Sequence, residues 1–165
     1  MRDQQDWVVP PDVPLGPHRL LVGLIDEVVA DCTIEAQASG KQIHWHCLVE
    51  ESHIQCNHSL LRSALENIIR NALAYTPEDT AIDVELLATA SQRMVSVRDY
   101  GPGIPKDQLK EIFNMFYRTE SELTRETVGT GIGLAIVHQL TTAMNGSVDV
   151  INREPGVEFR VSFPA

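Results

Sequence analysis

The order of apolar and polar residues predicts a chain that alternates between helices and strands. Apolar side chains recur every three or four positions, the spacing of a helix with one buried face, over three stretches: residues 19–39, 57–75 and 131–144. They recur at every second position, the spacing of a strand with one buried face, over residues 42–49, 82–86, 95–97 and 157–163. With a short strand near Ile54 and one more before the last, the pattern predicts an α/β (α+β) two-layer sandwich. Three main helices would cover one face of a mixed sheet of about five strands.

The segments between these elements are less regular. Asn57 is a good N-cap for the second helix. Residues 1–18 are rich in proline and predict a linker or an incoming segment, so the folded domain would span residues 19–165. A short helix is predicted over 107–117. Residues 118–128, rich in Thr and Glu and without an apolar period, are expected to be mobile.

Composition and charge narrow the possible functions. A chain of 165 residues, 43% of them apolar, is long enough for one well-packed domain. Its net charge of −10 argues against nucleic acid as a partner and against direct contact with an anionic membrane, because both attract basic surfaces. No apolar stretch approaches the roughly 20 residues that cross a bilayer, and the N-terminal residues do not have the pattern of a signal peptide.

Three cysteines and a pair of histidines are the residues that could form a disulfide or a metal site. Cys32, Cys47 and Cys56 form no CxxC pair, and we expect buried, reduced thiols of a cytosolic protein rather than a disulfide or a metal site. His44 and His46 share one face of a predicted strand, a spacing that can bind zinc. No nearby cysteine or aspartate completes a tetrahedral set, so we do not predict a metal there.

Two asparagines, Asn67 and Asn71, lie four positions apart on one face of the second helix. Leu60, Ala64 and Ala74 share that face, which we expect to turn toward the interior. Buried amides are costly unless they are satisfied, and an asparagine carbonyl together with water and phosphate oxygens suits Mg²⁺. The alternative is that both amides bond to neighbouring backbone groups.

A glycine-rich turn follows the strand at 95–97, with the sequence Asp99-Tyr100-Gly101-Pro102-Gly103-Ile104-Pro105. Asp99 continues the inward parity of Val95 and Val97, so its carboxylate should point into the domain. There it could accept a hydrogen bond from the exocyclic amine of adenine and select adenine over guanine. The glycines would let the backbone approach a ligand closely. The alternative is an ordinary loop in which the aspartate begins a turn.

A second glycine-rich segment opens the third helix: Gly129, Thr130, Gly131, Ile132, Gly133 and Leu134. Its backbone amides and the positive end of the helix dipole predict a site for phosphate oxygens. A dinucleotide-binding GxGxxG motif is excluded, because Leu134 stands where the third glycine would be and no strand leads in. No GKS or GKT occurs, which excludes a P-loop. The stretch before the segment would then be a lid that closes over a bound nucleotide.

Four segments, in this order, resemble the N, G1, F and G2 boxes of the ATP-binding domain of sensor histidine kinases. That domain has the Bergerat fold shared with gyrase, mismatch-repair ATPases and large ATP-driven chaperones. The matching segments are residues 66–77, 99–105, 112–118 and 129–135. The resemblance covers residues 19–164 and implies the fold expected above, with ATP and Mg²⁺ as cofactors.

The resemblance also implies a role for each matching residue. Asn71 would hold Mg²⁺, Asn67 would lie by the phosphates, and Asp99 would bind the adenine amine. The other positions form three groups: Tyr75, Gly101, Gly103 and Ile104 around the nucleotide; Phe113 and Phe116 as anchors of the lid; and Arg70, Arg118 and the segment Gly129–Leu134 near the phosphates. Arg118 would join Asn67 and Asn71 as a catalytic residue.

One position separates the branches of this superfamily. Hydrolytic members carry a glutamate four residues before the magnesium-binding asparagine, where it activates water. Here that position is Asn67, which cannot act as a base. Glu66 is one step, about 100°, around the helix. The resemblance therefore favours transfer of the γ-phosphoryl group to a histidine over hydrolysis.

The acceptor histidine is expected on another segment, because none of the six histidines has the sequence surroundings of the usual phosphoacceptor helix. The resemblance thus implies the cytoplasmic catalytic domain of a larger sensor kinase anchored in the bacterial inner membrane. Its partners would be the phosphoacceptor-helix domain of a dimeric parent and a downstream response regulator. Two alternatives stay open: an ATPase module of the gyrase or mismatch-repair type, and a degenerate nucleotide-binding domain, since Ala74 stands where many relatives have Lys or Arg.

Overall fold

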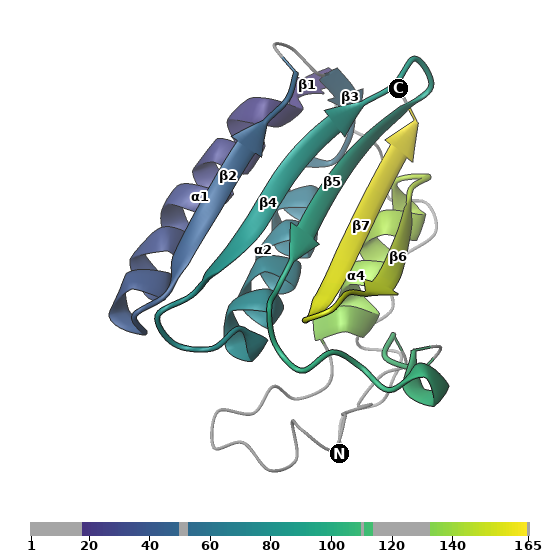
Figure 1. The fold of residues 1–165 in the computed structure, drawn as a ribbon. Helices are drawn as coiled ribbons and strands as arrows, with labels where there is room; N and C mark the ends of the chain where they lie inside the picture. The colour runs from purple at the N-terminus through teal and green to yellow at the C-terminus, as the bar shows by residue number, and fades with distance from the viewer. Residues whose placement is uncertain (1–17, 50–52, 110, 114–132, 165) are drawn as a thin grey trace, which may run out of the picture.

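The structure is a computed structural model that describes residues 18–49, 53–109, 111–113 and 133–164. Within these residues the main helices cover one face of an open five-stranded sheet, and the other face is uncovered (Figure 1). This is the two-layer architecture predicted from the sequence. In chain order the elements are β1 (His18–Leu20), α1 (Leu21–Ala38), β2 (Gln42–Cys47), β3 (His53–Gln55), α2 (His58–Tyr75), β4 (Ala81–Ala88), β5 (Gln92–Arg98), the 3₁₀ turn η2 (Lys106–Gln108), α4 (Gly133–Ala143), β6 (Ser147–Asn152) and β7 (Val157–Pro164).

The five-stranded sheet is mixed, as predicted. Its strand order is β2-β4-β5-β7-β6; β2 and β4 are parallel, and the other neighbours are antiparallel. The predicted alternation is confirmed in β7, where Val157, Phe159 and Val161 are buried and the residues between them are partly exposed. β1 and β3 pair with each other as a separate, short two-stranded sheet. In the sequence, β1 leads directly into α1 and β3 precedes α2. The apolar pattern did not predict β1, because it assigned His18 to the linker and the next two residues to the first helix.

Helix α2 lies in the middle of the helical layer and packs against both α1 and α4. Asn57 caps its start as predicted, since the side chain accepts a hydrogen bond from the backbone N–H of Leu60 at 3.1 Å. Near its other end, Lys41 Nζ donates to the carbonyl of Leu73 at 2.6 Å, which satisfies one of the carbonyls left open in a last turn. None of the helices in the described ranges is long and apolar enough to span a bilayer.

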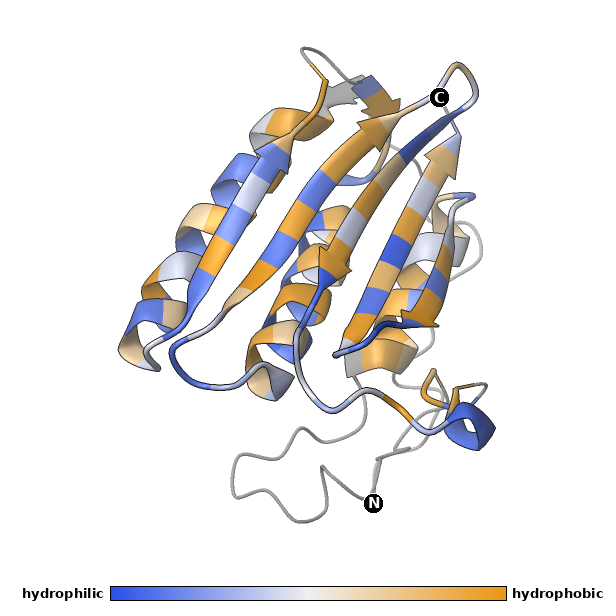
Figure 2. Cartoon of the chain, in the orientation of Figure 1, coloured by the Kyte–Doolittle hydropathy of each residue, from blue (hydrophilic) through white to orange (hydrophobic). Residues whose placement is uncertain are grey.

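The uncovered face of the sheet is polar, and its charges alternate in sign across the strands. One row of cross-strand neighbours on this face runs His44, Asp83, Arg98 and Glu158. Burial would raise the pKa of Glu158, but hydrogen bonds and charges from arginine neighbours, Arg160 first, outweigh it and leave that pKa below its usual value. Polar and apolar residues accordingly alternate along these strands (Figure 2). Because opposite charges are neighbours across the strands, this face of the sheet can be exposed to water without a covering helix.

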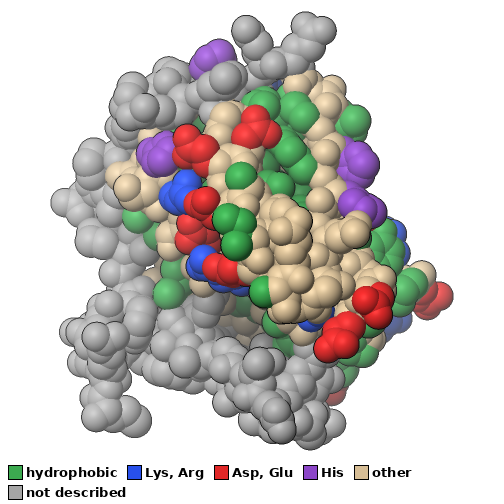
Figure 3. Space-filling view, turned by 90° about the vertical axis from the view of Figure 1, so that its left-hand side faces the viewer, with side chains coloured by type: hydrophobic (Ala, Val, Ile, Leu, Met, Phe, Trp, Pro, Cys, Tyr) green, Lys and Arg blue, Asp and Glu red, His purple; other side chains and the backbone are tan. Residues whose placement is uncertain are grey.

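A row of ion pairs joins the outer surfaces of α1 and α2. Arg62 on α2 reaches Glu27 and Asp31 on α1, and Arg70 reaches Glu35 at 2.9 Å. Acidic and basic side chains form one stripe on this side of the molecule (Figure 3). Because most of these side chains are exposed, each pair contributes little stability by itself. The row mainly specifies which faces of the two helices meet.

The cysteines follow the prediction only in part. Cys32 and Cys56 are buried, and burial raises the pKa of the Cys32 thiol to about 11. Cys47 is exposed, so the expectation of a buried thiol is wrong there. The reason is that β2 is an edge strand, whose side chains have a neighbouring strand on one side only.

The loop after β5 also differs from the prediction. In place of a short helix over 107–117, the described residues form only the 3₁₀ turn at Lys106–Gln108 and further turns at 111–113. The predicted linker, apart from His18, and the predicted mobile stretch at 118–128 lie outside the described residues.

Candidate functional site

Asp99 is the first residue of the loop at 99–105 and is only 2% exposed, so the prediction that its carboxylate points into the domain is confirmed. Its Oδ1 atom accepts hydrogen bonds from the backbone N–H groups of Gly101, at 3.0 Å, and Val157, at 3.3 Å. The backbone N–H of Asp99 donates to the carbonyl of Val157 at 2.9 Å, as in an antiparallel ladder. In such a ladder the N–H of Val157 would donate to the backbone carbonyl of Asp99. Here it donates to the Asp99 carboxylate instead, and this bond fixes the orientation of the carboxylate.

Two glycines let backbone pass close to this aspartate. Gly156 has φ +93°, and a Cβ there would lie 1.9 Å from the carbonyl oxygen of Asp99. A Cβ on Gly101 would lie 2.5 Å from the carbonyl oxygen of Tyr75, at the end of α2. The loop, the end of α2 and the turn between β6 and β7 thus meet by backbone contact. Sequence reasoning missed Gly156, although a Pro155-Gly156 dipeptide between two predicted strands is a turn signal.

The other end of the loop is bonded to Asn152, the last residue of β6. Its Oδ1 atom accepts a hydrogen bond from the backbone N–H of Ile104 at 2.9 Å, and its Nδ2 atom donates to the carbonyl of Ile104. Gly103 has φ +82°, and a Cβ there would lie 3.2 Å from Asn152 Oδ1. Sequence reasoning missed Asn152, because nothing near it in the sequence marks it as a contact of a loop 48 residues away.

Thr76 connects α2 to the same loop. This residue is 2% exposed, and its Oγ1 atom accepts a hydrogen bond from the backbone N–H of Tyr100 at 3.2 Å. The side chain of Tyr100 lies against the uncovered face of the sheet: its hydroxyl donates to Asp83, and the Arg98 guanidinium lies 4.6 Å from the ring centroid. The hydrogen bond to Asp83, followed by burial, raises the pKa of Tyr100. Tyr100 therefore fastens the loop to the sheet.

The asparagine face of α2 is more open than the sequence predicted. Ala64 is buried, but Asn67 and Asn71 are half-buried and Ala74 is exposed, so the expectation of an inward face is wrong. Asn67 Nδ2 donates to the carbonyl of Ser63 at 2.7 Å. For this amide the structure therefore has the alternative interpretation, a bond to a neighbouring backbone group. The Asn71 side chain makes no hydrogen bond within the part of the chain that the structure describes. Of the two amides, Asn71 is the better placed to bind a ligand.

Arg70 and Glu66 are directed away from the asparagines. The Arg70 guanidinium donates to both carboxylate oxygens of Glu35 on α1, at 2.9 and 3.1 Å. Glu66 lies between Arg62, at 2.9 Å, and Arg70, at 3.4 Å. The structure therefore does not bring Arg70 together with the other predicted site residues; it belongs to the row of ion pairs between α1 and α2.

Six predicted site residues lie outside the part of the chain that the structure describes: Phe116, Arg118, Gly129, Thr130, Gly131 and Ile132. Their roles stay predictions. Helix α4 begins at Gly133, and Leu134 packs against the core. Phe113 is described: its ring lies edge-on to Phe159 with 6.4 Å between centroids, which ties the end of the described loop to β7. The start of α4 and the loop at 99–105 lie at the same end of the sheet (Figure 1).

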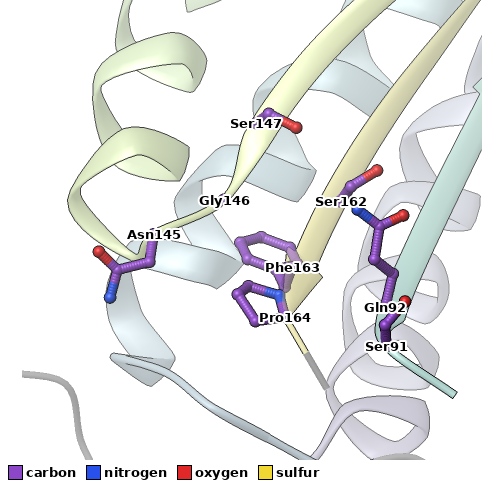
Figure 4. Close-up of a pocket in the computed structure, with 8 residues that line it drawn as sticks. All are labelled: Ser91, Gln92, Asn145, Gly146, Ser147, Ser162, Phe163 and Pro164. Carbon is purple, nitrogen blue, oxygen red and sulfur yellow. The ribbon is translucent and has the colours of Figure 1, made fainter.

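A pocket of about 260 Å³ lies at the opposite end of the sheet, where β5 and β6 begin and β7 ends. Its lining residues are labelled in Figure 4: Ser91, Gln92, Asn145, Gly146, Ser147, Ser162, Phe163 and Pro164. No charged side chain lines it, and none of the predicted site residues is among its walls. We therefore do not assign the site to this pocket.

Comparison with known proteins shows a family model and several relatives that match this chain. A family model described as histidine kinase-, DNA gyrase B-, and HSP90-like ATPase matches residues 56–165. The sensor histidine kinase CusS of Escherichia coli (strain K12) is 33% identical over 153 residues, which cover 92% of this chain and 32% of CusS. The chain thus spans about a third of the length of the curated relatives it matches.

Solved structures of histidine kinases share the fold. The catalytic domain of the histidine kinase ThkA matches with a TM-score of 0.79 and 26% identity, over 90% of this chain and 96% of that one. Full-length ShkA in complex with AMPPNP matches with a TM-score of 0.78 and 28% identity, over 95% of this chain and 32% of that one. These matches confirm the fold class and the resemblance inferred from the four sequence segments.

Proposed function

Because the chain belongs to the family of histidine kinase-, DNA gyrase B- and HSP90-like ATPases, we propose that it is the ATP-binding catalytic domain of a sensor histidine kinase. The observation that carries the proposal is the buried carboxylate of Asp99, held in one orientation by two backbone N–H groups. A carboxylate costs free energy to bury, and one held in a fixed orientation at the start of the glycine-rich loop is a candidate acceptor for a donor group of a ligand.

The ligand that fits this carboxylate is adenine. Its exocyclic amine is a donor, whereas guanine presents a carbonyl oxygen at the corresponding position, which would face the carboxylate as a second acceptor. Facing two acceptors with no donor between them costs about 1–3 kcal/mol, which is enough for strong selectivity. Tyr75, Gly101, Gly103 and Ile104 would form the walls around the base. The segment that leads into α4 would hold the phosphates through its backbone amides.

Asn71 is the residue that would hold Mg²⁺. It lies one helical turn before Tyr75 and is half-buried, and its carboxamide oxygen is a hard ligand of the kind Mg²⁺ takes. One protein ligand suffices, because Mg²⁺ usually keeps several waters and phosphate oxygens. When bound, the ion would offset charge on the phosphates. Asn67, one turn earlier, would lie beside those phosphates, and Arg118 is the remaining predicted contact.

The same helix favours transfer over hydrolysis. Neither asparagine can accept a proton from water, and the nearest carboxylate, Glu66, is bonded to Arg62 and Arg70. A histidine on a phosphoacceptor helix would attack instead: its nitrogen bonds to the γ-phosphorus as the bond to the bridging oxygen breaks and ADP leaves. We place that helix in the dimeric parent kinase, with a response regulator as the next acceptor. The parent would be anchored in the inner membrane, with this domain on the cytoplasmic side.

The test of nucleotide binding is calorimetric titration of the chain with ATP and with GTP. The variant is Asp99→Asn, which keeps the size of the side chain and an oxygen for the two backbone donors. The matched control is Asp149→Asn, an exposed aspartate on β6. We expect about 10- to 100-fold weaker ATP binding for the first variant and no change for the second. Equal ATP affinity in all three proteins would overturn the assignment of Asp99.

The test of transfer is a mixture of the chain, labelled ATP and a separate phosphoacceptor-helix fragment. We expect acid-labile phosphate on the fragment and little release of inorganic phosphate without it. Rapid hydrolysis with no labelled fragment would instead support an ATPase of the gyrase or mismatch-repair type.

A further inference from the structure

Asn152 holds the loop at 99–105 through two side-chain hydrogen bonds that replace the backbone bonds of a paired strand. Its carboxamide both accepts from the backbone N–H of Ile104 and donates to the carbonyl of Ile104. That is the pair of bonds that a backbone neighbour exchanges with a hydrogen-bonded residue of an antiparallel strand. A single side chain thus takes the place of a strand residue for a loop that has left the sheet.

The hairpin itself does not need this side chain. Asn152 is paired with Val157 through the strand ladder, and the N–H of Arg153 donates to the carbonyl of Gly156 at 2.8 Å, which closes the turn. The carboxamide is directed outward from the hairpin to Ile104, a residue whose side chain packs against the core. Its hydrogen bonds therefore serve the loop rather than the turn.

The same cross-strand pair holds both ends of the loop. Val157 donates to Asp99 Oδ1 at the first residue of the loop, and Asn152 bonds Ile104 near the last. Gly103 lets the loop come this close, because a Cβ there would lie 3.2 Å from Asn152 Oδ1 and 3.6 Å from the carbonyl oxygen of Gly156. Asn152 and Val157, which face each other across β6 and β7, thus set the distance between the Asp99 carboxylate and the far end of the loop.

We propose that Asn152 is a positioning residue, which fixes the loop at 99–105 so that its backbone and the Asp99 carboxylate present one shape to adenine. This inference rests on the proposed function, since adenine is the base named there. Asn152 acts through Ile104 and not by touching the nucleotide. Its loss should therefore weaken recognition of the base while the reacting phosphates keep their own contacts.

The experiment compares Asn152→Ala, Asn152→Asp and the control Ser147→Ala, an exposed residue at the other end of β6. Binding of ATP and GTP is measured by calorimetry, and transfer to a phosphoacceptor-helix fragment gives KM and kcat. We expect Asn152→Ala to raise the Kd and KM for ATP about tenfold, to lower the preference for ATP over GTP, and to change kcat less than twofold. Asn152→Asp keeps the acceptor for the Ile104 N–H but loses the donor, so its Kd should be intermediate. Ser147→Ala should match the original chain.

A role in stability alone would lower the unfolding midpoint of Asn152→Ala but leave its ATP-over-GTP ratio unchanged, and that result would overturn the proposal. A double variant separates the two ideas further, because Asn152→Ala should have no additional effect on selectivity once Asp99 is asparagine. If the original chain binds no ATP, the proposed function fails; if it binds ATP and Asn152→Ala binds equally well, only the positioning role fails.

Should Asn152→Ala not fold, hydrogen exchange decides. The proposal requires an Ile104 amide that is protected in the original chain and stays protected in Asn152→Asp, which keeps the acceptor for this N–H. An Ile104 amide that exchanges as fast as the exposed amides of the loop would overturn it.

Discussion

Replacing Gly156 with alanine should cost the protein stability and, through Asp99, nucleotide affinity. The new Cβ would lie 1.9 Å from the carbonyl oxygen of Asp99 and 2.9 Å from the Cα of Tyr100, so the backbone must move apart. The φ of +93° adds strain of about 1–2 kcal/mol for a residue with a Cβ. Forced separation of packed atoms typically costs a further 1–3 kcal/mol or so. The sum is about 2–5 kcal/mol, a large part of the roughly 5–15 kcal/mol that stabilises a domain.

Gly23 provides the matched control. It lies in the first turn of α1, and a Cβ there would have nothing within 4 Å. Gly23→Ala should therefore stabilise the chain by about 0.5 kcal/mol through helix propensity. The same replacement of glycine by alanine should therefore change the free energy of unfolding in opposite directions at the two positions, because the surroundings of the new Cβ differ.

Urea unfolding followed by circular dichroism measures both effects. With a slope of about 2 kcal/mol per molar urea, Gly156→Ala should lower the midpoint by about 1–2.5 M, and Gly23→Ala should raise it slightly. The folded fraction of Gly156→Ala should also bind ATP more weakly. A midpoint for Gly156→Ala equal to that of the original chain would refute the close packing of the turn against Asp99.

Three further predictions follow from single side chains. Asn71→Ala should make ATP affinity independent of Mg²⁺ in calorimetry; a retained dependence would assign the ion to another residue. Arg70→Met should lower the free energy of unfolding by less than about 1 kcal/mol and leave ATP affinity unchanged, because Arg70 is paired with Glu35; weaker ATP binding would restore its predicted phosphate role. The pKa of Glu158 is lowered in the folded state, so its contribution is complete above about pH 4.5 and is lost as the pH falls through that lowered pKa. Glu158→Gln should therefore destabilise the chain at pH 7 and flatten the acid limb of its stability curve; parallel curves would contradict this.

The sequence predicted those features that depend on local spacing. The period of two along β5 was sufficient to place the Asp99 side chain inside, because a strand alternates faces without regard to its neighbours. Asn57 was correctly identified as a cap for the same reason, since a capping bond joins residues three apart. Glycine spacing identified the loop at 99–105, but not what it packs against.

The features that were missed depend on contacts between distant segments. Asn152 and Gly156 contact the loop only because β7 pairs with β5, and no local pattern contains that pairing. Cys47 was placed inside because its strand alternates, but strand order decides that β2 lies at the edge. Arg70 shares a helix with the asparagines, yet a carboxylate on α1 determines where its guanidinium lies.

The bond between Val157 and Asp99 Oδ1 joins residues 58 apart in the sequence, and this separation has a consequence for folding order. The hairpins β4–β5 and β6–β7 each close a short loop and should form first, whereas β5 and β7 pair only after a much longer loop is closed. The carboxylate acquires its orientation at that late step. During refolding, the circular dichroism signal of the strands should therefore return before nucleotide binding does. The delay between the two measures the time at which the β4–β5 and β6–β7 hairpins pair with each other.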